Sequence, residues 1–349
     1  MATGLDGVIA ARTRLSDVQG EAGRLVLRGY TLEQIAGTWS FEQVVSLLWQ
    51  DLVPTAADLP AQLGAARVAA WQSVQPLLAF LPAKAPIDGM RFLLASFDDA
   101  QLSAVDLLAA AGVAMAAATR AGTGKTPLPP NAERSHAADL LHMLHDQPPA
   151  PTAIQAFETY LVAAVDHGLN ASTFTARVVA STGAGLVSAV VAALGALKGP
   201  LHGGAPGPVL DMLDAVGSAG NAAAWISAAL ARGERLMGFG HRIYRVRDPR
   251  ADVLKAAVGR LKTDRIALAE AIEHAGLAAL AQHKPGRKLD VNTEFYTALL
   301  LEALNIPRTG FTPVFAAART AGWIGHAVEQ QREGRLLRPA SEYIGPAAV

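Results

Sequence analysis

The chain has 349 residues, of which 51% are hydrophobic, so it is long enough to bury a large core. Lys and Arg total 30, and so do Asp and Glu; this zero net charge argues against a general binder of nucleic acid or anionic membranes. The absence of cysteine excludes disulfides and thiolate metal sites.

The first residues, MATGLDGVIAARTRLSD, carry charge before any long apolar run, so we expect no signal peptide and a cytoplasmic location. Short paired strands are expected only around RLVLRGY, residues 24–30. Thr31 and Ser40 then predict the starts of two short helices, each with a glutamate in its first turn. The Ala-rich residues 103–122 predict a helix that ends at Gly122.

Helical periodicity continues through the rest of the chain. Apolar residues at i, i+3 and i+4 predict further helices within residues 151–169, 221–238, 250–262 and 265–284. No internal repeat interrupts this pattern, and alternating β-branched runs are nearly absent. We therefore predict an all-α fold with many helices.

One stretch tests the expectation of a soluble protein. Residues 178–197, VVASTGAGLVSAVVAALGAL, carry no charge and are long enough to span a bilayer. Their side chains are mostly Ala, Gly, Ser and Val, which favour close packing between helices. We therefore favour a helix buried near a subunit interface over a membrane span.

Two short motifs match known ligand-binding motifs only in part. AGTGKT at 121–126 resembles a phosphate-binding loop, but Thr119 stands where that motif has its first glycine, and a helical stretch precedes it instead of a strand. His142 and His145 share a helix face, yet no third metal ligand is nearby. We expect neither a nucleotide-binding loop nor a metal site.

Three histidines lie in polar or glycine-rich segments: His167 in DHGLNASTF, His202 in KGPLHGGAP and His241 in GFGHRIYRVRDPR. Glycines beside the last two let a ligand approach the backbone closely. A histidine near a helix N-terminus has a lowered pKa and serves as a neutral hydrogen-bond donor. Arginines after His241 can hold carboxylates or phosphates, although Arg242 and Arg247 also fit a solvated basic loop. Together the three contexts predict a ligand site.

Several segments resemble the citrate synthase family in order and spacing. They are GLDGVIAARTRLSDV, GRLVLRGYTLEQIA, DHGLNASTFTARVVAST, GALKGPLHGGA, GFGHRIYRVRDPRA, NTEFYTALLLEALNIP and RPASEYIGP. The resemblance runs from Gly4 to Gly345, essentially the whole chain. It implies an acyltransferase of the tricarboxylic acid cycle that condenses acetyl-CoA with oxaloacetate to citrate and CoA. It implies no further cofactor, no metal, and no nucleic-acid or membrane partner.

The fold implied by the resemblance is an all-α, two-domain homodimer. Residues 1–202 and 299–349 would form the large domain and residues 203–298 the small one. The domains would close on oxaloacetate before acetyl-CoA binds productively, which also excludes water.

The family's roles transfer to matching positions. His202 resembles the histidine that binds the thioester carbonyl and stabilises the enol, and His241 the one that polarises the ketone. The implied oxaloacetate clamp comprises His167, Arg250, Arg319 and, from the second subunit, Arg338. The implied contacts with CoA come from Met237, Gly238, Phe239, Gly240 and Arg245.

The position of the base departs from the family pattern. The family usually has aspartate in Asn-Val-Asp-Phe-Tyr, whereas this chain has Glu294 in Asn-Thr-Glu-Phe-Tyr, and Val291 replaces the proline that often comes first. The added methylene extends the reach by about 1.3 Å, and a displacement of about 1 Å can cost roughly a hundredfold in rate. We expect Glu294 to be the base, with Asp290 as the alternative.

Two other functions fit the same motifs. One is a 2-methylcitrate synthase that uses propionyl-CoA. The other is a non-catalytic member that binds CoA or a carboxylate, which the change to Glu294 would allow. The retained histidines and arginines favour an enzyme.

Overall fold

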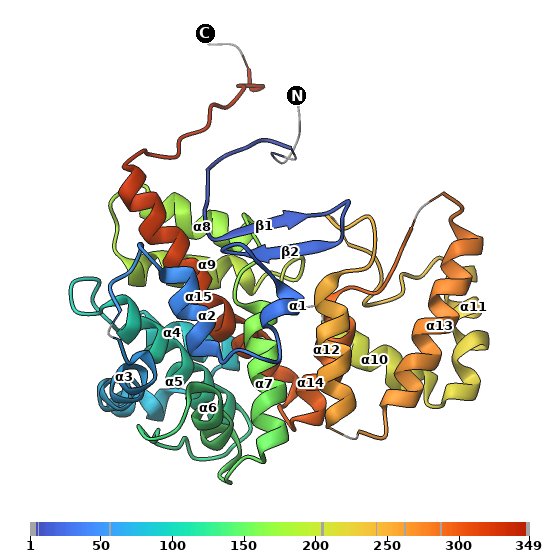
Figure 1. The fold of residues 1–349 in the computed structure, drawn as a ribbon, viewed down its shortest axis with the longest axis horizontal. Coiled ribbons are helices and arrows are strands. Elements are labelled where there is room, and N and C mark those ends of the chain that lie inside the picture. The colour runs from blue at the N-terminus through green and yellow to red at the C-terminus, as the bar shows by residue number, and fades with distance from the viewer. Residues whose placement is uncertain are drawn as a thin grey trace.

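The computed structural model describes residues 5, 7–55, 57–203, 206–241, 243–261, 263–286 and 288–346. Within them the fold is mostly helical, as predicted, with one small sheet near the N-terminus (Figure 1). The first part of the chain forms α1 (Leu32–Ile35), α2 (Phe41–Trp49), α3 (Leu59–Val74), α4 (Pro86–Leu94), α5 (Ala104–Gly122), α6 (His136–His145), α7 (Pro151–Ala164), α8 (Ala171–Ala180) and α9 (Leu186–Leu197). The second part forms α10 (Pro206–Val216), α11 (Ala222–Ala231), α12 (Pro249–Arg260), α13 (Ile266–His283), α14 (Thr293–Ala303) and α15 (Phe311–Glu333). Short 3₁₀ helices lie at Gln75–Phe80, Ala219–Asn221 and Arg308–Gly310.

The small sheet supports the loop that follows α11. Its strands β1 (Ser16–Gln19), β2 (Arg24–Leu27) and β3 (Tyr30–Thr31) are antiparallel neighbours, which confirms the strands expected around residues 24–30. The carbonyl of Gly20, in the β1–β2 turn, accepts a hydrogen bond from Arg245 N at 3.1 Å. A Cβ on Gly20 would clash with the carbonyl oxygen of Ile243, so glycine is required for this approach.

Three helices start where the candidate site residues gather, because polar side chains cap them. Asn170 caps α8, Asp248 caps α12 and Asn292 caps α14, each accepting a hydrogen bond from a backbone N–H of the first turn. Pro249 occupies the first position of α12, where a missing N–H costs nothing.

Helix α5 forms the centre of the core and packs against α3, α4 and α15. Among the described residues it is the one helix with the length and hydropathy of a membrane span, and 94% of that window is buried inside the protein. The charge-free residues 178–197 do not form a single helix, because α8 ends at Ala180 and α9 begins at Leu186. The expectation of one long buried helix there was wrong.

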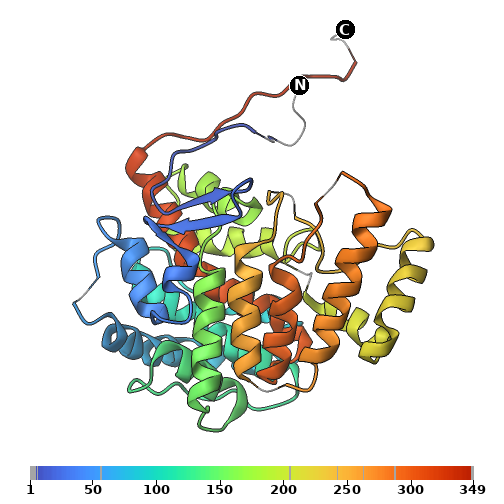
Figure 2. The same ribbon diagram turned by 45° about the vertical axis from the view of Figure 1, so that its right-hand side comes forward.

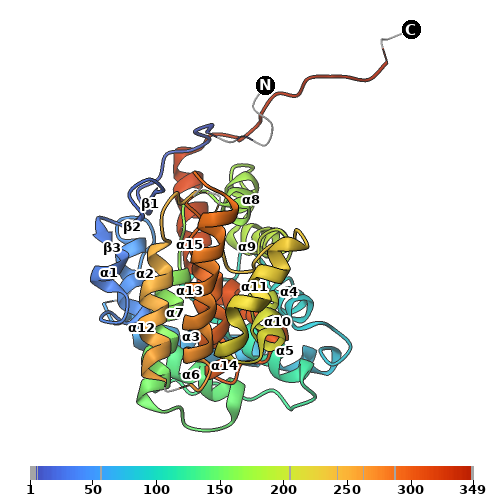
Figure 3. The same ribbon diagram turned by 90° about the vertical axis from the view of Figure 1, so that its right-hand side faces the viewer.

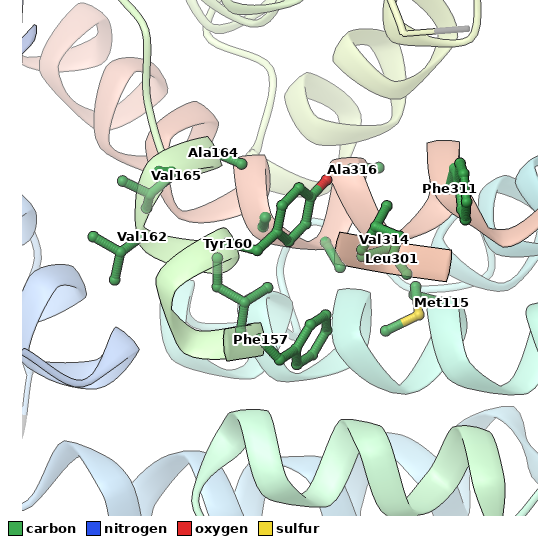
Figure 4. Close-up of a cluster of buried hydrophobic side chains, with 14 of the residues drawn as sticks. Met115, Phe157, Tyr160, Val162, Ala164, Val165, Leu301, Phe311, Val314 and Ala316 are labelled. Atoms are coloured by element: carbon green, nitrogen blue, oxygen red, sulfur yellow. The ribbon is translucent and has the colours of Figure 1, made fainter. Parts of the chain in front are cut away.

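Large apolar side chains meet between α5, α7, α14 and α15 (Figure 4). Phe157 and Tyr160 of α7 face Leu301 of α14 and Val314 of α15, with Met115 of α5 beside them; all five are buried. Burial of each such side chain contributes roughly 1.5–3 kcal/mol to stability. The cluster fixes the relative positions of α14 and α15, which carry candidate site residues, and of α7, which precedes His167.

Helices α10 to α14 gather on one side of the molecule (Figure 1 and Figure 2). There α11 packs on α13, and α10 and α12 pack on α14, while α12 and α14 also contact α7. We predict that residues 203–298 form a small domain. Helix α14 continues across that limit to Ala303, so the predicted boundary falls within a helix.

The chain beyond α15 is extended and exposed. The N-terminal segment and the residues after Glu333 leave the helical body on the same side in Figure 1, Figure 2 and Figure 3. Both segments carry apolar side chains in water: Ile9 is 88% exposed and Ile344 is 91% exposed.

Candidate active site

The segment MGFG (237–240) forms a tight turn against the start of α14. Gly238 and Gly240 have φ of +78° and +82°, a conformation that favours glycine. A Cβ on Gly238 would lie 2.9 Å from Phe295. Asn292 donates from its backbone N to Gly238 O at 2.9 Å and from Nδ2 to Gly240 O at 2.8 Å. The backbone thus fixes the position of the residue that follows.

That residue, His241, is a neutral hydrogen-bond donor. Its Nδ1 accepts from the backbone N–H of Ile243 (3.0 Å) and Tyr244 (3.1 Å), so the ring proton lies on Nε2. Burial and the neighbouring Arg250 lower the pKa of His241 to about 4. His241 Nε2 lies 3.3 Å from Arg250 Nη2. With the ring proton on Nε2, two N–H donors lie side by side, and one acceptor oxygen can bind both of them.

Arg250 is buried and paired with Asp248. The Asp248 carboxylate accepts from Arg250 Nε at 3.0 Å and Nη2 at 2.7 Å, and its Oδ2 also accepts from Thr293 N at 3.2 Å. Burial is the largest influence and lowers the pKa of Arg250, but Asp248 outweighs it, so the net shift is upward. This bidentate pair orients the guanidinium and joins the starts of α12 and α14.

His167, in the loop between α7 and α8, contacts this group from the main body. Its Nε2 lies 3.1 Å from the Tyr244 hydroxyl, and its ring centroid lies 5.6 Å from that of His241. Burial, followed by the charges of Arg250 and Arg319, holds the pKa of His167 well below its usual range. His167 is therefore neutral and tied to the His241 loop through Tyr244.

Arg319 lies buried on α15. Its Nε donates to the carbonyl of Ala164, and its guanidinium lies 4.8 Å from the centroid of the Phe315 ring. Burial lowers the pKa of Arg319 to about 10, so it stays charged at neutral pH. Its two terminal nitrogens have no hydrogen-bond partner among the described residues, which leaves them free for an anionic ligand.

His202, between α9 and α10, is held in the opposite tautomer to His241. Ser172 N at the start of α8 donates to His202 Nε2 at 3.3 Å, so the ring proton lies on Nδ1. Ser172 Oγ lies 2.8 Å from the same nitrogen and accepts from Trp323 Nε1 at 3.1 Å. Burial and Arg319 lower the pKa of His202 to about 4. His202 thus presents a neutral N–H on Nδ1.

Glu294 lies in the first turn of α14 and makes no hydrogen bond through its carboxylate to any described residue. Burial and the nearby Asp248 raise the pKa of Glu294 to about 7. The alternative base, Asp290, has its carboxylate 2.9 Å from Arg247 Nη1 and 2.7 Å from its own following amide, Val291 N. Geometry therefore favours Glu294, a carboxylate free to accept a proton.

Arg247 is not the solvated residue that a basic loop would provide. It pairs with Asp252 and Glu273 at 2.6 Å each and with Asp290 at 2.9 Å. These pairs hold the loop against α12 and α13. Arg242, the other arginine interpreted in that way, lies outside the described residues.

The structure does not bring every predicted site residue to this cluster. The Phe239 ring packs in the core against Phe295, at 5.6 Å between centroids, so the MGFG turn offers mainly backbone. Met237 is partly buried, and the Arg245 side chain is exposed. Arg338 is exposed on the extended segment after α15, and no contact joins it to the residues described above. A groove of about 800 Å³ between α2 and Arg332 contains none of these residues.

Sequence reasoning missed three supporting residues. Tyr244 bridges His167 and the His241 loop, Asp248 orients Arg250, and Ser172 sets the tautomer of His202. The Asp-Pro step at 248–249 is a signal for a helix start and would have identified Asp248 as a cap. Tyr244 and Ser172 carry no such local signal.

The arrangement offers two neutral imidazole donors, two buried arginines and one carboxylate that titrates near neutrality. The donors beside Arg250 and Arg319 suit an anion that also carries a carbonyl oxygen. A free carboxylate with a pKa of about 7 suits proton abstraction at neutral pH.

Known proteins resemble this chain over almost its whole length. The family model described as "Citrate synthase, C-terminal domain" matches residues 4–340. The putative citrate synthase 2 of Mycobacterium tuberculosis is 41% identical over 356 residues, covering 98% of this chain and 92% of the relative. The 2-methylcitrate synthase of the same species is 36% identical over 355 residues, covering 98% and 90%. A solved ternary complex of Thermoplasma acidophilum citrate synthase with carboxymethyl coenzyme A and oxaloacetate has a TM-score of 0.88 at 25% identity, covering 100% of this chain and 97% of that one.

Proposed function

The chain belongs to the citrate synthase family, and we propose that it condenses acetyl-CoA with oxaloacetate to give citrate and CoA. The observation that carries this proposal is the pair of proton-bearing nitrogens, His241 Nε2 and Arg250 Nη2, only 3.3 Å apart. A ketone oxygen next to a carboxylate, as in oxaloacetate, accepts hydrogen bonds from both. His167 and Arg319 then complete the clamp around the dicarboxylate.

The base and the second histidine act on the other substrate. Glu294 removes a proton from the acetyl methyl group while His202 Nδ1–H binds the thioester oxygen. The enol carbon attacks the ketone carbon of oxaloacetate, and His241 and Arg250 stabilise the negative charge that develops on the ketone oxygen. His241 Nε2–H then gives its proton to that oxygen, which becomes the hydroxyl of the citryl thioester. Water then cleaves the C–S bond of the citryl thioester and releases the thiol of CoA.

An assay of thiol release tests the proposal directly. The protein is incubated with oxaloacetate and acetyl-CoA, and the free thiol is measured with a disulfide reagent. Because the chain has no cysteine, it adds no background to the signal. We expect thiol release that depends on both substrates; no release with any acyl-CoA would support the non-catalytic alternative.

A second candidate is 2-methylcitrate synthesis from propionyl-CoA, because a 2-methylcitrate synthase matches this chain at 36% identity and 98% coverage. We favour acetyl-CoA, since Glu294 extends about 1.3 Å further than the usual aspartate and leaves less room for an extra methyl group. A higher kcat/KM for propionyl-CoA than for acetyl-CoA would reverse this preference.

We further propose that the enzyme is a homodimer in which Arg338 reaches the site of the partner. Arg338 lies on an extended segment that also exposes Leu336, Tyr343 and Ile344 to water. Apolar side chains on an extended terminal arm favour burial against another chain. A second copy of the chain would also bring Arg338, whose guanidinium has no partner among the described residues, next to a dicarboxylate.

Hybrid dimers test this arrangement. His202→Ala and Arg338→Ala proteins should each be inactive, but a mixture that exchanges subunits should regain activity. In such hybrids one of the two sites carries neither substitution. Exchange is followed with differently tagged subunits. Demonstrated exchange without any return of activity would contradict the shared site.

A further inference from the structure

A buried polar chain runs beneath the loop that carries His167. It consists of Arg177 on α8, His326 on α15 and Asp166, which directly precedes His167; all three are fully buried. His326 Nδ1 lies 3.1 Å from Arg177 Nη1, and His326 Nε2 lies 3.2 Å from Asp166 Oδ1. We call these three residues the buried relay.

The chemistry of arginine fixes the proton of His326. A guanidinium only donates hydrogen bonds, so His326 Nδ1 accepts and the ring proton lies on Nε2, facing Asp166. The two atoms lie 3.2 Å apart without hydrogen-bond geometry, so the contact between them is electrostatic. Burial, the largest influence, raises the pKa of Asp166, but His326, Arg319 and Ser16 together hold it below its usual value. Asp166 is therefore a buried carboxylate that responds to both His326 and Arg319.

The other oxygen of Asp166 organises the loop. Ser16 Oγ donates to Asp166 Oδ2, and Gly168 N donates to Ser16 Oγ at 3.0 Å. His167 thus lies between Asp166 and Gly168, both of which are hydrogen-bonded to Ser16. A shift of the Asp166 carboxylate would move His167 with it.

The face of α15 that meets this loop is shaped for close contact. Arg319, Gly322 and His326 are spaced i, i+3 and i+7, so they share one face. A Cβ on Gly322 would clash with the carbonyl of Val165 and lie 2.9 Å from Asp166 Oδ1. The absence of a side chain there lets Asp166 sit between Arg319 and His326.

The outer end of the relay holds both terminal segments of the chain. Arg177 Nη1 pairs with Glu329 Oε2 at 2.7 Å, and Glu329 Oε1 accepts from Arg14 N at 2.9 Å. Gln330 accepts from Arg177 Nε at 2.8 Å and donates to Arg335 O at 3.0 Å. The segment that leads to Arg338 therefore begins at the same cluster.

We propose that the buried relay positions His167 and Arg319 for the carboxylates of the oxo acid. Replacing a buried ionic group by apolar side chains of similar size is often neutral or stabilising, so stability alone does not account for these three residues. The relay fixes where the His167 loop and the Arg319 guanidinium lie relative to each other. The proposal rests on the proposed function, because oxaloacetate is the ligand that His167 and Arg319 would hold.

Two substitutions at His326 test the relay. His326→Leu removes both contacts, and we expect KM for oxaloacetate to rise about tenfold or more, with KM for acetyl-CoA within about twofold of the parent value. His326→Gln restores an acceptor toward Arg177 and a donor toward Asp166, and we expect it to recover most of the oxaloacetate affinity. The matched control is Ile324→Ala, a fully buried change on the same helix outside the relay, which should lower the melting temperature without changing KM for oxaloacetate.

The outcomes separate the relay from the proposed function. If the parent protein neither binds oxaloacetate by calorimetry nor releases thiol, the proposed function fails and the relay proposal with it. If the parent is active and folded His326→Leu keeps its oxaloacetate KM, only the relay is wrong. Should His326→Leu not fold, Ser16→Ala tests the relay from outside it, because Ser16 is the half-buried residue that donates to Asp166 Oδ2. An oxaloacetate KM several-fold above that of the parent supports the proposal, and an unchanged KM overturns it.

Discussion

Glu294→Gln is expected to lower kcat by roughly 10²–10⁴-fold while oxaloacetate binding survives. Glutamine keeps the size of the side chain but lacks the basic lone pair that, in the proposed mechanism, takes the proton of the acyl-CoA methyl group. Glu294 makes no hydrogen bond to any described residue through its carboxylate, so the exchange should disturb little else. Thiol release measures kcat, and calorimetry with oxaloacetate alone measures binding.

The matched control is Asp290→Asn, four residues earlier. Asp290 pairs with Arg247 at the rim, so we expect its loss to cost stability and to leave turnover within a few-fold of the parent. If Glu294→Gln turns over like the parent and Asp290→Asn does not, Asp290 is the base. Glu294→Asp should retain part of the activity, and its ratio of propionyl-CoA to acetyl-CoA use should rise because the carboxylate is withdrawn.

The pH dependence should identify the same carboxyl group. Burial and Asp248 raise the pKa of Glu294 to about 7, so kcat/KM for acetyl-CoA should fall about tenfold per pH unit below that value and level off above it. His202 and His241 have pKa values of about 4, so they stay neutral across this range. A flat profile between pH 5 and pH 7 would contradict the assignment.

The raised pKa of Glu294 also predicts a change in stability. A carboxyl group whose pKa is raised by folding contributes stability below its ordinary pKa, near 4.5, and this contribution is lost as the pH rises through about 7. Glutamine does not ionise, so Glu294→Gln does not undergo this loss over this pH range, while the parent does. From pH 4.5 to pH 8 the unfolding free energy of Glu294→Gln should therefore gain roughly 2–3 kcal/mol relative to the parent, as measured by urea denaturation.

His241→Ala is expected to lower kcat by at least roughly 10²–10³-fold, the loss that follows removal of one well-placed donor to a developing oxyanion. Alanine also removes the acceptor for Ile243 N and Tyr244 N, which could displace the loop. His241→Asn separates the two effects. Its Oδ1 can take the place of Nδ1 as acceptor, while nothing replaces Nε2.

We therefore expect the same large loss of kcat in both His241 variants, and a melting temperature closer to that of the parent in His241→Asn. The control is His283→Ala, an exposed histidine at the end of α13, which should keep full activity. Citrate formation by folded His241→Asn at the parent rate would overturn the role given to Nε2.

The local signals of the sequence predicted the starts and ends of several helices correctly. Ser40 forms a capping box with Gln43, and α5 ends at Gly122 as expected. The prediction of one helix over residues 178–197 was wrong because composition does not show where the backbone hydrogen bonds of a helix stop. There the Ser181 and Thr182 hydroxyls bond to the carbonyls of the last turn of α8.

The sequence predicted the functional groups of the candidate site better than it predicted the residues that hold those groups in place. His167, His241 and Arg250 carry recognisable segments, and the structure brings them together. Arg247 pairs with Glu273, 26 residues further along the chain, and with Asp290, 43 residues further along. No local pattern links residues so far apart. The same holds for Ser172 and His202, which meet only because α8 starts beside the turn after α9.

The buried Trp323 gives this protein an intrinsic optical probe. Its indole N–H donates to Ser172 Oγ, the hydroxyl that also lies against His202 Nε2. Indole fluorescence is sensitive to hydrogen bonding and to the local electric field. A thioester that binds His202 Nδ1 changes the polarisation of the ring, and that change reaches the indole through a single serine. With the other tryptophans replaced by phenylalanine, the emission of Trp323 would report acyl-CoA binding in real time without any attached dye.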